Sequence, residues 1–127
     1  MLPNLLIIGV PKAGTTSIFS YLNLHKDVFG SNPKEPGYFH PLRWGEKLAN
    51  IDEYENAFSG YSNQKYAMEA TPGYFYGGKK VSDKMKDILP NSRVIIVLRD
   101  PVQRLFSFYK YKLSLGHIDS SLSFEEY

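Results

Sequence analysis

A short apolar run near the start of the chain, followed by a glycine-containing turn and a helical pattern, places the strongest constraint on the fold. Residues 4–10 read NLLIIGV, which is typical of a strand buried on both faces. In residues 15–23, Ile18, Phe19 and Leu22 recur at helical spacing. A buried strand that leads into a helix is the unit from which parallel sheets with helical covers are built. The start of the chain therefore predicts an α/β fold.

Two more strands are predicted further along. Residues 65–70 have the length of a short strand, and residues 93–98 (RVIIVL) form the clearest strand of the sequence because they are β-branched and uninterrupted. Residues 29–45 contain three prolines and three glycines, so we expect mostly loop there. No internal repeat is visible, and the chain is expected to form one domain over residues 1–127.

Three further helices are predicted. Asp52 and Glu55 have the spacing of a capping box, and the helix they begin would bury Tyr54 and Phe58. The next helix has an apolar stripe and stops at Pro90, and the last begins at Pro101 and ends at Gly116. Their apolar stripes consist of Val81, Met85, Ile88 and Leu89, and of Val102, Leu105, Phe106, Tyr109 and Leu113. Strands that alternate with helices predict three layers, α/β/α, around a central parallel sheet.

Composition narrows the class of protein. With 127 residues, 43% of them hydrophobic, the chain can bury the core of one domain. A formal net charge of +2 argues against a nucleic-acid binder, and the absence of cysteine excludes disulfides and thiolate metal sites. No apolar run approaches a membrane span and no signal peptide precedes the first strand, so we expect a cytoplasmic protein. The last residues, FEEY, look like the start of another element, which suggests a fold truncated at its C-terminus.

The loop between the first strand and the first helix, GVPKAGTT, has the layout of a phosphate-binding loop. Its glycines would let successive N–H groups and the helix N-terminus point at one anion. Thr15 stands where the nucleotide triphosphatase pattern requires its Lys, and the loop's lysine is Lys12, so a different anion is expected. The alternative is a tight turn made by Pro11 and Gly14, with Thr15 as a helix cap.

A second anion site is possible after the strand at residues 93–98. Arg99 follows that strand directly, at the edge where open α/β sheets bind ligands. Ser107 lies on the next helix, off the apolar stripe and on the same face as Arg104. Arg99 and Ser107 could converge on a second phosphate. The alternative is that residues 99–101 form an ion pair and a helix start.

Four stretches with these features occur in one order: IIGVPKAGTTSIFSYLNLHKDV, KEPGYF, MEATPGYF and VIIVLRDPVQRLFSFY. Together they resemble the sulfotransferases that use 3′-phosphoadenosine 5′-phosphosulfate (PAPS), above all the glycosaminoglycan enzymes such as the heparan sulfate group and their bacterial counterparts. The resemblance implies a fold with the topology of the P-loop triphosphatases and a PAPS co-substrate that leaves as adenosine 3′,5′-bisphosphate (PAP). It implies that the 5′-phosphosulfate is held by Lys12, Ala13, Gly14, Thr15 and Thr16. It further implies that Arg99 and Ser107 bind the 3′-phosphate and that Glu35 is the general base.

In the mechanism that we expect, Glu35 takes the proton of an acceptor hydroxyl and Lys12 neutralises the charge that grows on the leaving phosphate, with no metal required. The acceptor would be a carbohydrate or another small molecule. Two positions depart from the family pattern. Ala70 stands where glycosaminoglycan enzymes typically have a Lys, which argues against a heparan-like acceptor, and Gly37 stands where the family often has a His.

Other residues and functions stay open. His40 and Glu69 are further acid–base candidates, and Glu69 could point into the cleft to orient Lys12 or the acceptor; His25 and His117 are assigned no role. Aromatic side chains near the expected cleft could stack on a nucleoside or sugar, or simply pack in the core: Tyr38, Phe39, Tyr74, Phe75 and Tyr76. The alternative functions are a P-loop nucleotide kinase or triphosphatase, and a non-catalytic nucleotide-binding fragment.

Overall fold

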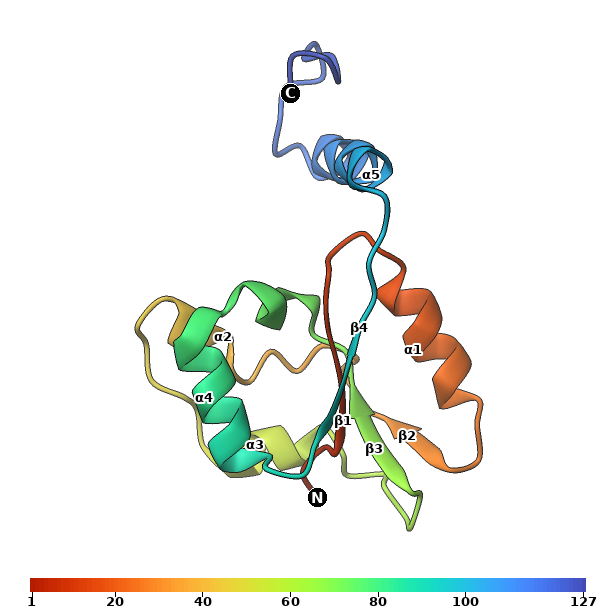
Figure 1. Cartoon of the computed structure of the whole chain (residues 1–127), viewed down its shortest axis with the longest axis vertical. Coiled ribbons are helices and arrows are strands. Elements are labelled where there is room, and N and C mark those ends of the chain that lie inside the picture. Colours follow the sequence, from red (N-terminus) through yellow and green to blue (C-terminus); the bar gives the residue numbers. More distant parts are fainter. The chain divides into compact units, whose positions relative to one another are not determined.

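A four-stranded parallel sheet organises most of the computed structural model, which describes all 127 residues (Figure 1). The strand order is β2-β3-β1-β4. The strands are β1 (Leu5–Gly9), β2 (Val28–Gly30), β3 (Tyr66–Glu69) and β4 (Arg93–Ile96). In register, Leu5 lies opposite both Met68 and Arg93. Because all the strands run in the same direction, their carboxyl ends meet at one edge of the sheet.

Helices cover both faces of this sheet, which confirms the predicted α/β/α architecture. The helices of this part are α1 (Thr15–Asn23), α2 (His40–Arg43), α3 (Ile51–Asn56), the 3₁₀ helix η1 (Pro72–Tyr76) and α4 (Gly78–Ile88). Figure 1 shows α1 on one side and α3 with α4 on the other. Side chains of β1 alternate between the two faces, since Leu6 packs with the buried residues of α3 and α4 whereas Leu5 and Ile7 pack with Phe19 of α1.

Two elements lie where the sequence predicted mostly loop. The strand β2 pairs with β3 from Val28 to Gly30, and α2 is a single turn. The other residues of 29–45 lie outside helices and strands, so the prediction of mostly loop is confirmed. The two short elements were not predicted, because neither is long enough to show a hydrophobic period.

The start of α3 also corrects the prediction. Its cap is Asn50, whose side-chain oxygen accepts a hydrogen bond from the Asp52 N–H at 3.2 Å. Asp52 therefore lies inside the first turn and does not cap the helix. The expected burial of Tyr54 and Phe58 is confirmed.

The chain divides into two compact units, Met1–Val97 and Leu98–Tyr127, and the second is built around α5 (Pro101–Ser114). The Asp100 side chain caps α5 by accepting from the Gln103 N–H at 2.9 Å. Tyr109 is buried and its ring packs against those of Phe124 and Tyr127. The rest of the predicted buried stripe is largely exposed, with Val102 at 67% and Leu105 at 49%. Within this unit, the segment after α5 packs on the Tyr109 side of the helix, which is why that prediction was only partly right.

None of the helices is both long enough and apolar enough to span a membrane.

Candidate active site

The loop between β1 and α1 leaves the N-terminus of α1 without a side-chain cap. Lys12 and Gly14 both have positive φ, 64° and 96°, and the Ala13 N–H turns back to the carbonyl of Val10. Gly14 is the residue that caps α1, and no side chain caps the helix. The N–H groups of the first helical turn, which have no partner within a helix, therefore keep their hydrogen-bonding capacity for a ligand.

The two threonines of this loop differ in their surroundings. Thr15 is the first residue of α1 and is buried, so the alternative in which Thr15 caps the helix is wrong. Thr16 is exposed, and its hydroxyl oxygen accepts a hydrogen bond from the Lys34 ammonium at 2.9 Å. The loop is thus connected to the segment that follows β2.

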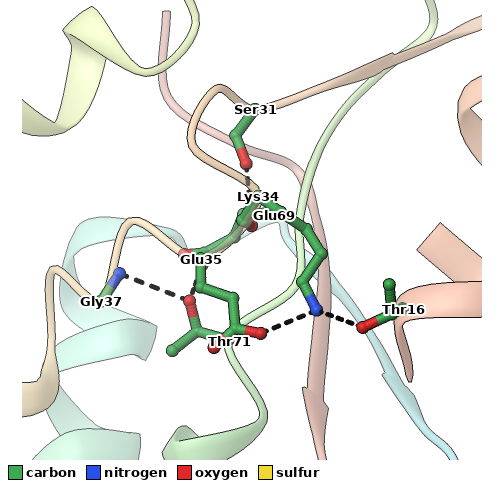
Figure 2. A network of polar contacts seen from close by, with 7 residues as sticks. All are labelled: Thr16, Ser31, Lys34, Glu35, Gly37, Glu69 and Thr71. Atoms are coloured by element: carbon green, nitrogen blue, oxygen red, sulfur yellow. Dashed lines mark hydrogen bonds and ion pairs between the residues drawn. The ribbon is translucent and has the colours of Figure 1, made fainter. Parts of the chain in front are cut away.

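Glu35 lies in that segment and pairs with the same lysine. The Lys34 ammonium lies 2.7 Å from Oε1 of Glu35, and the Glu35 side chain is 48% exposed (Figure 2). The structure therefore links the candidate base to the start of α1 through Lys34. Lys34 was not predicted as part of the site, because β2, which brings residue 34 to the carboxyl edge of the sheet, was not predicted.

Glu69, at the end of β3, lies in different surroundings from those expected. It is fully buried; Tyr54 donates its hydroxyl to Oε1 and Thr71 donates its hydroxyl to Oε2. Burial raises the pKa of Glu69 to about 7, although the hydrogen bonds from Thr71 and Tyr54 oppose the shift. The prediction that Glu69 points into a cleft was wrong, because its carboxylate lies in the core.

The buried carboxylate is connected to the segment that carries Glu35. The Thr71 hydroxyl accepts from the Gly37 N–H at 3.4 Å, and the Tyr74 hydroxyl accepts from the Phe39 N–H at 3.3 Å. Figure 2 shows Glu35, Gly37 and Thr71 close together. These contacts fix the backbone on the C-terminal side of Glu35.

The aromatic residues of the region mostly pack in the core. Phe39 and Tyr74 are buried, and the ring of Tyr38 stacks on that of Tyr54 at 4.5 Å. Phe75 and Tyr76 are the exposed members of the set, each at 43%. Core packing therefore accounts for Phe39 and Tyr74.

His40 is partly buried against the ring of Tyr74. Burial lowers its pKa, while the charge of Glu35 acts in the opposite direction. No group of three or more His, Asp or Glu side chains in the chain could hold a metal ion.

Arg99 and Ser107 both belong to the second unit. Arg99 is exposed and directly precedes the capping residue Asp100, and Ser107 is partly buried on α5. The helix start expected in the alternative reading is present. Arg99 therefore lies two residues before the first residue of α5.

Comparison with known proteins agrees with this geometry. The family model described as "Sulfotransferase domain" matches residues 2–127. The chain is 34% identical over 116 residues to a membrane-associated sulfotransferase, kil1, of Dictyostelium discoideum, covering 88% of this chain and 23% of the relative. It is 32% identical over 116 residues to the human heparan sulfate glucosamine 3-O-sulfotransferase 6, covering 88% of this chain and 31% of the relative.

A solved structure shares the fold. The crystal structure of a sulfotransferase from Alicyclobacillus acidocaldarius superposes with a TM-score of 0.88 at 28% identity, over 99% of this chain and 55% of that one. The chain thus spans about half of that structure and less of the curated relatives. The matched family is that of the sulfotransferases and not that of the nucleotide kinases or triphosphatases. With its parallel sheet, the uncapped helix start after β1 and a family match over residues 2–127, the chain belongs to the sulfotransferase family.

Proposed function

We propose that the protein transfers a sulfuryl group from PAPS to a hydroxyl of a carbohydrate or another small acceptor. The observation that carries this proposal is the uncapped start of α1, with the Lys34–Glu35 pair attached to it through Thr16. Transfer of a sulfuryl group to a hydroxyl needs an anion site for the donor and a base beside it. The uncapped start of α1 and the Glu35 carboxylate support these two roles.

The loop of residues 12–16 would hold the 5′-phosphosulfate. Lys12 and Gly14 adopt positive φ, which turns the loop, and the remaining residues of the proposed site are Ala13, Thr15 and Thr16. Lys12 would neutralise the charge that grows on the leaving phosphate oxygen. Arg99 and Ser107, in the second unit, would bind the 3′-phosphate, so that the two ends of the donor are held by separate anion sites.

Glu35 would act as the general base. It is exposed enough to meet an acceptor, and its neighbours on both sides are fixed, since the Lys34 carbonyl accepts from the Ala70 N–H and the Gly37 N–H donates to Thr71. In the reaction the acceptor oxygen bonds to sulfur while the bond from sulfur to the phosphate oxygen breaks. The electron pair stays on the phosphate, and the hydroxyl proton passes to Glu35.

The acceptor proposed for this chain is less anionic than a heparan chain. Ala70, whose N–H donates to the Lys34 carbonyl, adds no positive charge at the end of β3. An acceptor that carries many sulfates would need cations to balance its charge.

A transfer assay tests the function. The chain would be incubated with PAPS that carries an isotopic label in its sulfuryl group and with a panel of hydroxyl acceptors. The panel includes neutral saccharides and a heparan fragment. We expect label to reach a saccharide, and the Glu35→Gln variant to turn over about 10²–10⁴-fold more slowly at saturating PAPS. Unchanged turnover of Glu35→Gln would remove Glu35 as the base. Magnesium-dependent hydrolysis of ATP without sulfate transfer would favour the triphosphatase instead.

A further inference from the structure

Lys34 lies where a cation could contact the transferred group. Its ammonium donates to the Thr16 hydroxyl at 2.9 Å, on the first turn of α1, where the helix has no side-chain cap. The same ammonium lies 2.7 Å from the Glu35 carboxylate (Figure 2). It therefore joins the expected anion site to the candidate base.

The backbone of Lys34 is fixed, whereas its charged end can move. The Lys34 carbonyl accepts from the Ala70 N–H at 3.0 Å and from the Ser31 hydroxyl at 3.1 Å. These bonds tie the residue to the ends of β3 and β2. A lysine side chain has a flexible stem of four carbons that ends in a compact charge. Its ammonium can therefore exchange one anionic partner for another without a backbone movement.

Stability alone does not account for this arrangement. The Lys34 and Glu35 side chains are 21% and 48% exposed, and ion pairs in such surroundings contribute little to folding. The Lys34–Glu35 pair instead places one positive and one negative charge beside the loop that also carries Lys12. Lys12 lies in the loop that directly precedes the start of α1 in the chain, whereas Lys34 reaches Thr16 from the segment after β2.

We propose that Lys34 binds an oxygen of the sulfuryl group when PAPS occupies the loop and, in doing so, gives up its ion pair and frees Glu35 for the acceptor. The inference rests on the proposed function and adds a second catalytic cation to it. Lys12 balances charge on the leaving phosphate, and Lys34 balances charge on the group in transfer. Glu35 takes the acceptor proton only after its ion pair with Lys34 has opened, which couples donor binding to activation of the base.

The test is a comparison of PAPS with PAP, which lacks the sulfuryl group. Dissociation constants of both ligands would be measured by calorimetry for the wild type and for Lys34→Met. We expect Lys34→Met to weaken the binding of PAPS by about ten- to a hundredfold and the binding of PAP far less. The reason is that the lost contact is a charged hydrogen bond to the sulfuryl group, which PAP lacks. The control is Lys79→Met, which removes an ion pair between exposed side chains, that of Lys79 with Asp83 on α4. It should leave both affinities unchanged.

A double-mutant cycle gives a second measurement that does not depend on Lys34→Met alone. Glu35→Gln should increase the affinity for PAPS relative to that for PAP, because Lys34 then has no ion pair to break when PAPS binds. This gain should vanish in the Lys34→Met/Glu35→Gln double variant. Equal losses for PAPS and PAP in Lys34→Met, or no loss, would overturn the role of Lys34 while leaving the proposed function intact. A wild type that binds neither ligand would overturn both.

Discussion

At the scale of single residues, Glu69 is the side chain whose chemistry the fold changes most. Its carboxylate is fully buried beside Tyr54, Thr71 and Tyr74, and burial raises its pKa from the ordinary 4.5 to about 7. The sequence placed Glu69 at a strand end but could not say which face of the sheet it would meet. That depends on the packing of Tyr54, which is distant in sequence.

This shift predicts a pH dependence of stability. Because the folded state favours the protonated carboxyl, Glu69 stabilises the fold fully below pH 4.5 and loses that contribution as the pH rises through about 7. Relative to the Glu69→Gln variant, the wild type should lose up to about 3 kcal/mol of unfolding free energy between pH 4 and pH 8. Urea denaturation at both pH values measures this difference. A difference between wild type and Glu69→Gln that stays constant with pH would contradict the raised pKa of Glu69.

Gly14 carries a second prediction at this scale. Its φ is 96°, and an added Cβ would meet no atom within 4 Å, so the glycine is required for its backbone conformation and not for space. Gly14→Ala should cost roughly 1–2 kcal/mol of stability or shift the loop out of its anion-binding shape. Denaturation would measure a loss of stability, and titration with PAP would measure a loss of ligand affinity. A variant that keeps both stability and affinity would show that the loop does not need this conformation.

At the scale of elements, the long periodic segments were predictable and the short ones were not. The helix over residues 15–23 matches α1, and the strands and helices around Met68, Met85 and Ile95 lie where the apolar patterns placed them. The strand β2 was missed because its three residues are held by pairing with β3, a contact that is not local in sequence. Lys34 was missed with it, so the error in the fold became an error in the site.

The capping of α3 gives a prediction for this scale. Asn50→Ala should destabilise the protein by about 1 kcal/mol, because the Asp52 N–H loses its side-chain acceptor. Asp52→Ala should cost less, since Asp52 does not cap the helix. Thermal denaturation of the two variants distinguishes them. If Asp52→Ala were the more harmful change, the capping box predicted from sequence would be the better description.

At the scale of the whole molecule, the sheet has two separate cores, one with α1 and one with α3 and α4. The proposed phosphosulfate loop belongs to Met1–Val97, and the proposed ligands of the 3′-phosphate belong to Leu98–Tyr127. A ligand that binds the folded chain and not the unfolded one stabilises the fold. PAP at about 100 times its dissociation constant should add roughly 2.7 kcal/mol.

Chelation separates this account from a metal-dependent one. If Lys12 and the amides of the loop supply the positive charge, EDTA should leave the stabilisation by PAP unchanged. Thermal melting with PAP, with and without EDTA, is the measurement. A loss of the stabilisation in EDTA would mean that a metal ion takes part in binding the ligand.

The proposed donor carries phosphates at both ends of its nucleoside, and calorimetry with PAP and AMP measures whether the chain recognises both. We expect PAP to bind at least about tenfold more tightly than AMP, since a charged phosphate contact contributes about 1.5–3 kcal/mol. Arg99→Ala should reduce the affinity for PAP to that for AMP, and Lys12→Ala should weaken both. If the wild type bound PAP no more tightly than AMP, the two-site account would be contradicted.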